Sequence, residues 1–181
     1  CFVPTREITY KIAPSFSTST INVDGIVISA FPTTISYPIN QIVNISPNLD
    51  PLYDFSSWSS DSGIVMPTAN SPVASFSTSF SDTVTLNIVN KPFIIYYVDP
   101  PGTTTSMNIN GIVISVFPTT ILYPTNQIVN ISPNLDPLYE FNSWSSDNVI
   151  VMPTAYSPVA SFSASNNDTI VLDIVFISPT Y

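Results

Sequence analysis

The chain repeats itself, and this internal duplication limits the folds open to it more than any other feature. Residues 25–79 match residues 111–165 at 46 of 55 positions, at a constant offset of 86 residues and without a gap. The same offset extends more weakly to two strand-like segments, which align 8–12 with 94–98 and 83–89 with 169–175. The repeating unit is therefore about 86 residues long, and two units follow one another in the chain.

The ends of the units set the expected domain boundaries. We expect the first unit at residues 1–89 and the second at 90–175. The closing strand of the first unit runs through Asn90-Lys91-Pro92 into the opening strand of the second, which predicts two domains held close together. Residues 176–181 match the approach to a further unit. We expect them to begin a third repeat or to act as a donor strand that completes a neighbouring molecule.

The composition favours strands over helices. β-branched and aromatic residues dominate, 18 prolines are spread along the chain, and no stretch shows sustained helical spacing. In the first unit the pattern predicts short strands at 8–12, 25–31, 41–46, 53–58, 64–66, 73–76 and 83–89. Short strands separated by turn residues predict an all-β fold of two tandem small antiparallel β-sandwiches with immunoglobulin-like architecture.

The low content of charged residues and the negative net charge limit which partners and which cellular location we expect for this protein. Only 8% of the residues are charged, so Ser, Thr, Asn and Pro must supply the polar surface. Twelve acidic residues against three basic ones give a net charge of −9, which argues against nucleic acid and anionic membranes as partners. No apolar run approaches the roughly 20 residues of a transmembrane helix. Few basic residues also mean few sites for trypsin-like proteases, which suits an extracellular or cell-surface protein.

The chain has one cysteine, Cys1, so no disulfide within the chain is possible and packing must stabilise it. Lipoprotein processing leaves an N-terminal cysteine that carries lipid. The alternative is that the chain simply starts at this residue. No signal peptide is visible, and we interpret the sequence as a mature form or a fragment.

One motif carries a family resemblance. The segment YDFSSWSSD at 53–61 recurs as YEFNSWSSD at 139–147. In the first unit it follows QIVNISP at 41–47 and precedes a closing strand that begins DTVTLN at 82–87. This pattern resembles internalin-B-repeat-like and related bacterial and archaeal immunoglobulin-like tandem surface repeats. The resemblance covers most of each unit and implies small tandem β domains of surface proteins, adhesins and sheaths, with no catalytic residues to carry over.

The residue types in the sequence argue against a catalytic site or a metal site. The chain contains no histidine, which removes Ser-His-Asp sites, Cys-His sites and the usual zinc ligand sets. Two near-identical copies side by side are unusual for an enzyme, so we expect no enzyme and no cofactor. The acidic residues are candidate calcium ligands or, as we favour, turn and cap residues, because no Asp-x-Asp-x-Asp-Gly loop is present. The calcium candidates are Asp50, Asp54, Asp61, Asp136, Glu140 and Asp147.

Two further residue types have a structural and a functional interpretation. Trp58 and Trp144 are either sugar-stacking platforms or core residues, and we predict core because each is a single Trp among Tyr and Phe in a β unit. Asn44, Asn130 and Asn167 each begin an Asn-x-Ser/Thr triplet, which makes them candidates for N-glycosylation.

The two copies differ on one strand face. The outward positions of the opening strand are Glu7, Thr9 and Lys11 in the first unit, and Phe93, Ile95 and Tyr97 in the second. An apolar outer face needs a cover, so we expect it to pack against the first unit or a neighbouring subunit. The alternative is a strand buried on both faces within its own domain. The assembly candidates are Phe93, Ile95, Tyr97, Ile174 and Phe176.

These observations predict a non-catalytic extracellular structural repeat that assembles into a filament, sheath or stalk. Its partners would be copies of itself or neighbouring repeats, and strand donation is one route to assembly. The second hypothesis is an adhesin module that binds glycan or a host surface through loops such as Pro47 to Pro51.

Overall fold

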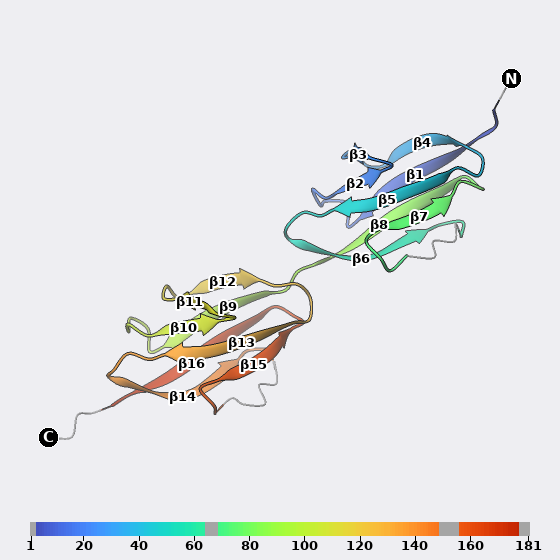
Figure 1. The fold of residues 1–181 in the computed structure, drawn as a ribbon. Helices are drawn as coiled ribbons and strands as arrows, with labels where there is room; N and C mark the ends of the chain where they lie inside the picture. Colours follow the sequence, from blue (N-terminus) through green and yellow to red (C-terminus); the bar gives the residue numbers. More distant parts are fainter. Residues whose placement is uncertain (1–2, 64–68, 149–155, 178–181) are drawn as a thin grey trace. The chain divides into compact units, whose positions relative to one another are not determined.

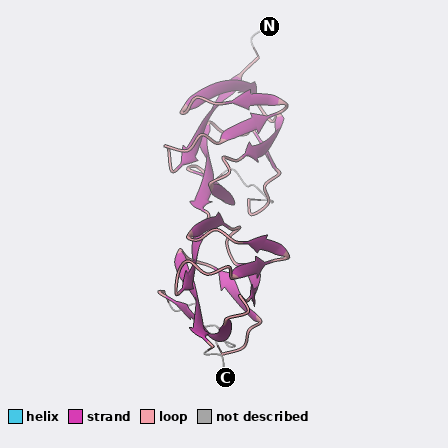
Figure 2. Ribbon diagram, turned by 90° about the vertical axis from the view of Figure 1, so that its left-hand side faces the viewer, coloured by secondary structure: helices cyan, strands magenta, loops and turns pink. Residues whose placement is uncertain are grey.

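The computed structural model describes residues 3–63, 69–148 and 156–177. The chain divides into two compact units, Cys1–Asn90 and Lys91–Tyr181, and each unit has a hydrophobic core of its own (Figure 1). The described residues form strands, turns and bends without a helix (Figure 2). Accordingly, this part of the chain contains no helix of the length and hydropathy needed to cross a membrane.

Unit 1 contains eight described strands. They are β1 (Thr5–Ala13), β2 (Thr20–Val23), β3 (Ile26–Ile28), β4 (Thr33–Pro38), β5 (Ile42–Asn48), β6 (Tyr53–Ser60), β7 (Ala74–Ser77) and β8 (Asp82–Asn90). They form two four-stranded sheets with the orders β4-β1-β8-β6 and β3-β2-β5-β7. Neighbouring strands are antiparallel except β1 and β8, which pair in parallel. The first and last strands of the unit thus lie side by side within one sheet.

Unit 2 repeats this arrangement. Its strands are β9 (Phe93–Asp99), β10 (Ser106–Ile109), β11 (Ile112–Ile114), β12 (Thr119–Leu122), β13 (Gln127–Asn134), β14 (Tyr139–Ser146), β15 (Ala160–Ala164) and β16 (Asp168–Phe176). The sheet orders are β12-β9-β16-β14 and β11-β10-β13-β15, and β9 pairs in parallel with β16. Each unit is therefore an all-β sandwich of two sheets, as the strand pattern predicts.

The inner faces of the two sheets of a unit share one core. In unit 1, alternation along β1 turns Ile8 and Tyr10 inward, and the second sheet contributes Val43 and Ile45 of β5 to the same cluster. Trp58 belongs to this cluster and is 2% exposed, and its indole Nε1 donates a hydrogen bond to the carbonyl oxygen of Pro72 at 3.1 Å. The equivalent Trp144 is 3% exposed in the core of unit 2.

Each core also encloses a pair of tyrosine hydroxyls. The hydroxyls of Tyr10 and Tyr37 lie 2.9 Å apart in unit 1, and those of Tyr96 and Tyr123 lie 2.8 Å apart in unit 2. Burial raises the pKa of all four hydroxyls, and the paired hydroxyl raises it further for Tyr10 and Tyr96. All four therefore stay protonated in the folded state at neutral pH.

The strands at the start of each unit differ from the predicted pattern. The strand predicted at 25–31 ends as β3 at Ile28, and the chain resumes as β4 directly after Pro32, which the sequence pattern does not predict. The unpredicted β2 joins β3 through Asp24 and Gly25, which have φ values of 48° and 89°. Two successive positive φ angles suit the tight turn of a two-residue hairpin.

β5 is longer than the strand predicted at 41–46 and contains a proline. β5 continues through Pro47 to Asn48, although proline cannot donate to a ladder. The neighbouring β7 pairs with β5 only as far as Ile45, so β5 has an open side at Pro47. A missing N–H that faces this open side removes no ladder hydrogen bond. The strand predicted at 64–66 lies outside the described residues.

The C-terminal segment begins inside unit 2. Phe176 is the last residue of β16 and pairs with Tyr139, and the N–H of Ile177 donates to the carbonyl of Leu138 at 2.8 Å. These two residues, predicted to start a third repeat or a donor strand, therefore extend the pairing of β16 with β14. Residues 178–181 lie outside the described residues.

Candidate functional site

An apolar patch lies on the outward face of the sheet β12-β9-β16-β14. In β9, Phe93 and Tyr97 point away from the core and are 37% and 39% exposed, and Ile95 between them is half-buried. The register places Leu122 of β12 beside Phe93, and Val171 of β16 beside Tyr97. These five residues form a continuous surface across three strands, here called the apolar patch.

The same five positions are polar in unit 1. They are Glu7, Thr9, Lys11, Ser36 and Thr85, and the register again brings Glu7 beside Ser36 and Lys11 beside Thr85. The two units share sheet orders and strand pairings, so the fold itself does not require apolar residues there. The apolar patch therefore points to a role outside the folding of unit 2.

Exposure decides between the two interpretations of this face. A strand buried on both faces within its own domain would hide Phe93 and Tyr97, and both remain more than one third exposed. That alternative is therefore wrong. The prediction that Ile174 takes part in assembly is also wrong. The alternation of β16 places its side chain in the core, where it is 5% exposed.

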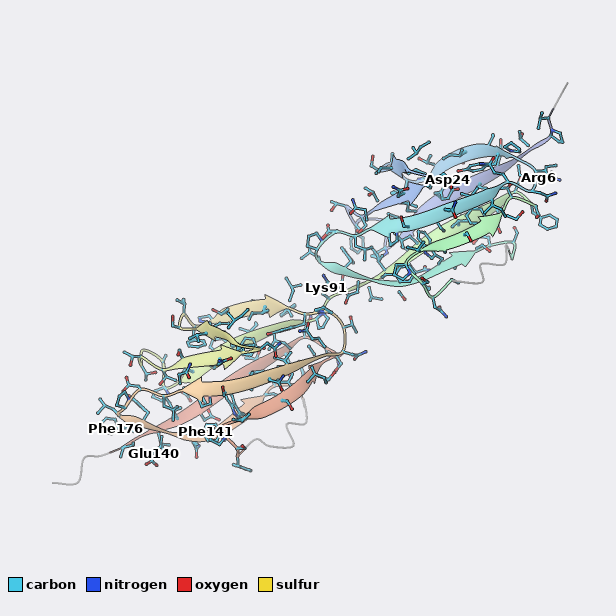
Figure 3. The ribbon with its side chains drawn as sticks, viewed as in Figure 1. Arg6, Asp24, Lys91, Glu140, Phe141 and Phe176 are labelled. Atoms are coloured by element: carbon cyan, nitrogen blue, oxygen red, sulfur yellow. The ribbon has the colours of Figure 1, made fainter. Side chains whose placement is uncertain are left out.

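Phe176, the last assembly candidate, lies apart from the apolar patch. It is 59% exposed, and its ring meets the edge of the Tyr139 ring with centroids 5.7 Å apart. Figure 3 shows it at the end of β16, near Glu140 and Phe141 of β14. The Phe176 side chain thus packs against Tyr139 of its own unit on one side, and the rest of it is exposed to solvent.

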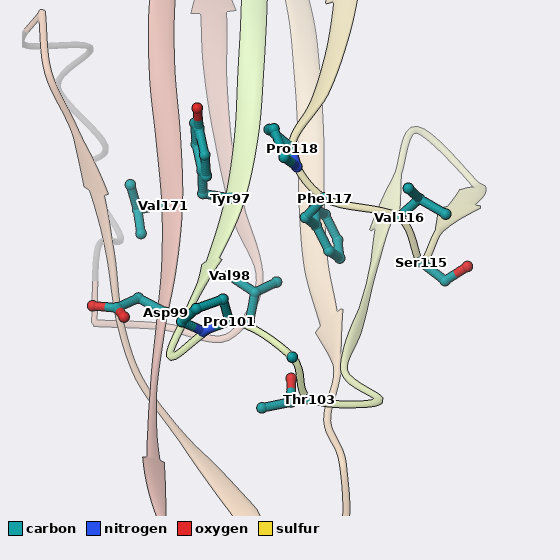
Figure 4. Close-up of a pocket in the computed structure, with 11 residues that line it drawn as sticks. Tyr97, Val98, Asp99, Pro101, Thr103, Ser115, Val116, Phe117, Pro118 and Val171 are labelled. Atoms are coloured by element: carbon teal, nitrogen blue, oxygen red, sulfur yellow. The ribbon is translucent and has the colours of Figure 1, made fainter.

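A cavity of about 670 Å³ adjoins the apolar patch (Figure 4). It lies between residues 97–103, which end β9 and begin the following turn, and residues 115–118, which lead into β12. Tyr97 and Val171 belong to both the cavity and the apolar patch. The other lining residues are Val98, Asp99, Pro101, Gly102, Thr103, Ser115, Val116, Phe117 and Pro118. Aromatic, proline and aliphatic side chains thus form most of the wall.

The charged residues beside the cavity are all acidic. Asp99 lines the cavity and is exposed, and the register places Asp173 of β16 beside it. Asp173 Oδ2 accepts a hydrogen bond from Ser143 Oγ at 2.9 Å. The equivalent residues in unit 1 are Ala13 and Asn87, which carry no charge. These two positions therefore carry two carboxylates in unit 2 and no charged group in unit 1.

The calcium candidates do not converge. Asp50 lies before the first residue of β6, Asp54 lies within the strand, and Asp61 follows its last residue. Eight extended residues span roughly 26 Å, far beyond the reach of one ion's ligand shell. The same holds for Asp136, Glu140 and Asp147 around β14, and within the described ranges no three acidic or cysteine side chains could share a metal ion.

Two of these acids are turn residues instead. Asp50 accepts hydrogen bonds from the Thr18 hydroxyl and from the N–H of Leu52, the latter at 2.9 Å. Asp136 accepts the equivalent bonds from Thr104 Oγ1 at 2.6 Å and from the N–H of Leu138 at 2.9 Å. The threonine hydroxyl, and then the backbone N–H, lower the pKa of both carboxyl groups.

The sequence pattern misses a second pair of structural acids. Asp82 and Asp168 are 7% and 3% exposed at the start of β8 and β16. Asp82 Oδ1 accepts the N–H of Ser62 at 2.8 Å, and Asp168 Oδ1 accepts the N–H groups of Asp147 and Asn148 at 3.1 and 3.0 Å. Both acids occupy the inward register of an alternating strand, which is the signal that would have found them.

The three glycosylation candidates are exposed. Asn44 and Asn130 lie on the outward faces of β5 and β13, and Asn167 lies in the turn before β16. Asn44 Nδ2 donates to Asp24 Oδ1 at 3.0 Å, and Asn167 Oδ1 accepts the N–H of Phe93 at 3.0 Å. Cys1, the lipid candidate, lies outside the described residues.

Comparisons with known proteins return distant structural neighbours only. No family model and no curated protein matches the chain, so the resemblance to internalin-B-like repeats stays a prediction. The chain is similar to a major pilin protein of Streptococcus pyogenes, at 8% identity and a TM-score of 0.38, over 96% of this chain and 97% of that one.

Two further solved structures show the same low level of likeness. One is the pilus adhesin SpaC of Lactobacillus rhamnosus GG, at 7% identity and a TM-score of 0.32, over 98% of this chain and 32% of that one. The other is a second major pilin of S. pyogenes, at 9% identity and a TM-score of 0.31, over 94% and 96%. Likeness at this level indicates neither a function nor a partner for this chain.

Proposed function

We propose that this chain is a non-catalytic structural module of an extracellular surface assembly, and that its copies associate laterally through the apolar patch of unit 2. The observation that carries the proposal is the exchange of five polar residues in unit 1 for five apolar ones at the same sheet positions in unit 2. Contiguous exposed apolar surface of a few hundred Å² commonly marks an interaction site on a soluble domain.

The distribution of charge favours a second copy as the partner. The apolar patch fills the rows of Phe93, Ile95 and Tyr97, and the acidic side chains follow at the end of β9. Asp99 and Asp173 share the next row, and Glu140 lies beside Val175 one row further on. Two copies that pair about a two-fold axis, with their β9 strands antiparallel, bring the apolar rows together. Their acidic rows then lie at opposite outer ends of the contact, so like charges stay apart and remain in water.

The size of the apolar patch predicts a weak contact. A stable interface buries roughly 800 Å² on each partner, and five partly exposed side chains supply less than that. A weak contact suits a repeated module, because linked contacts along an array bind together far more tightly than one alone. Strand donation is not part of the proposal, since Phe176 and Ile177 already pair within their own unit.

The test replaces the apolar patch by the residues of unit 1. The variant carries Phe93→Glu, Ile95→Thr, Tyr97→Lys, Leu122→Ser and Val171→Thr, each a residue that unit 1 accommodates at the same sheet position. Sedimentation velocity over a wide concentration range should show reversible dimers for the parent chain and monomers for the variant.

A control variant carries serine at Val113 and Ile128, which are exposed residues of the other sheet of unit 2. This control should dimerise like the parent. A parent chain that stays monomeric at about 1 mM, or a variant that dimerises as the parent does, would refute the proposal. Circular dichroism establishes that each variant keeps its strand content.

A further inference from the structure

We propose that the cavity beside β9 binds the side chain of an arginine or lysine presented by a partner protein. The methylene stem would pack against the rings of Tyr97 and Phe117, and the cationic head would meet the carboxylate of Asp99. This recognition site is distinct from pairing through the apolar patch, although Tyr97 and Val171 lie in both.

The walls of the cavity suit an aliphatic stem. Tyr97, Phe117, Pro101 and Pro118 line the cavity together with Val98, which Figure 4 shows between Pro101 and Phe117. Long basic side chains bury their methylene groups against such surfaces and keep the charged end near water. A cation close to an aromatic face gains further attraction from the ring. The volume of about 670 Å³ lies in the range of ligand sites.

The charge of the site is complementary to a cation. Asp99 is exposed at the cavity, and no basic residue lines it. Asp173 lies beside Asp99 in the parallel pair of β16 and β9. Like charges at neighbouring sheet positions destabilise each other, and a bound cation relieves that repulsion. An arginine or lysine head would form charge-assisted hydrogen bonds with this acidic edge.

Unit 1 keeps Phe31 and Pro32 at the positions of Phe117 and Pro118 but lacks the other features, and it serves as an internal comparison. Lys11 replaces Tyr97, Ala13 replaces Asp99, and Asn87 replaces Asp173. An ammonium group at position 11 repels a second cation, and no carboxylate stands beside it. Gly102, whose φ of 84° suits glycine, is also replaced in unit 1, by Phe16. Eight of the eleven residues that line the cavity thus differ from their equivalents in unit 1.

The experiment titrates the full chain with the peptide acetyl-Leu-Arg-Leu-amide and, in parallel, with the same peptide carrying glutamine for arginine. Backbone amide shifts in NMR spectra should change at residues 97–103 and 115–118 with the arginine peptide. The Asp99→Ala variant should bind it about tenfold or more weakly, because a hydrogen bond to a charged group is lost. Asp173→Asn should weaken binding less, and raised salt should weaken binding by the parent chain.

Several outcomes overturn the proposal. Equal affinity of parent and Asp99→Ala for the arginine peptide, equal affinity of the parent for both peptides, or no binding up to about 10 mM would each do so. The variant Phe93→Glu with Leu122→Ser changes the apolar patch without touching the cavity, and it should bind the arginine peptide normally. Asp99→Ala should conversely still dimerise. Failure of one proposal is therefore distinguishable from failure of the other.

Discussion

The buried tyrosine pair of unit 1 allows a quantitative test of how this core is stabilised. Tyr10 is fully buried, Tyr37 is 7% exposed, and their hydroxyls form one hydrogen bond at 2.9 Å. Tyr37→Phe leaves the Tyr10 hydroxyl without its partner and out of reach of water. Tyr10→Phe leaves the Tyr37 hydroxyl, which lies closer to solvent. The double variant removes both hydroxyls and leaves no orphaned group.

The magnitudes follow from this difference. An unsatisfied buried hydroxyl costs about 1–3 kcal/mol of unfolding free energy, whereas one paired neutral hydrogen bond contributes about 1 kcal/mol net. We expect Tyr37→Phe near the upper end of that range and Tyr10→Phe near the lower end. The double variant should lie within about 1 kcal/mol of the parent, so the two substitutions are strongly non-additive.

Urea unfolding measures these free energies. Trp144→Phe, placed in every variant, leaves Trp58 as the single tryptophan, and its fluorescence then reports on unit 1. Additive costs, within about 0.5 kcal/mol, would show that the hydroxyls do not depend on each other and would refute the reasoning. The equivalent cycle at Tyr96 and Tyr123, followed by Trp144 fluorescence in a Trp58→Phe background, should give the same sign.

Three further predictions concern the core, pH and assembly. Trp58→Ala should destabilise unit 1 by about 3–5 kcal/mol in urea unfolding, because it empties a buried site of large volume. Burial raises the pKa of Tyr10 and Tyr96 above that of a tyrosine in the unfolded chain, so these hydroxyls contribute fully to folding stability below a pH of about 10. The urea midpoint should therefore fall as the pH rises above about 10. This fall should be smaller in a variant with Phe at positions 10 and 96. Grafting the apolar patch onto unit 1, at the five equivalent positions, should replace the dimers expected in sedimentation by larger, concentration-dependent species.

Local periodicity predicts much of this fold but not its pairing. The alternation of Val84, Leu86 and Ile88 identifies the inward face of β8, and the structure buries all three. The parallel pairing of β1 with β8 joins residues more than seventy positions apart, and no local pattern encodes such a contact. β2 and β4 escape prediction because turn residues adjoin them: β2 runs into Asp24 and Gly25, and β4 lies between Pro32 and its own last residue, Pro38.

The sequence predicts only those parts of the candidate site that do not depend on strand pairing. Comparison of the two copies singles out Phe93, Ile95 and Tyr97 from sequence alone. Leu122 and Val171 join them only through strand pairing, which also brings Asp173 beside Asp99. Ile174 is an assembly candidate as part of the expected donor strand, yet it is the equivalent of Ile88, so the alternation of the closing strand places it in the core.

The polar face of unit 1 has a physical consequence for assembly. A chain with one self-complementary patch closes into a pair, because the two-fold contact uses the patch of both copies and leaves none free. A chain with a patch on each unit would keep one free after every contact and would grow without a limit. Glu7, Thr9 and Lys11 therefore do more than cover unit 1 with polar groups. In the proposed association, this hydrated outer face would restrict pairing to the apolar patch of unit 2.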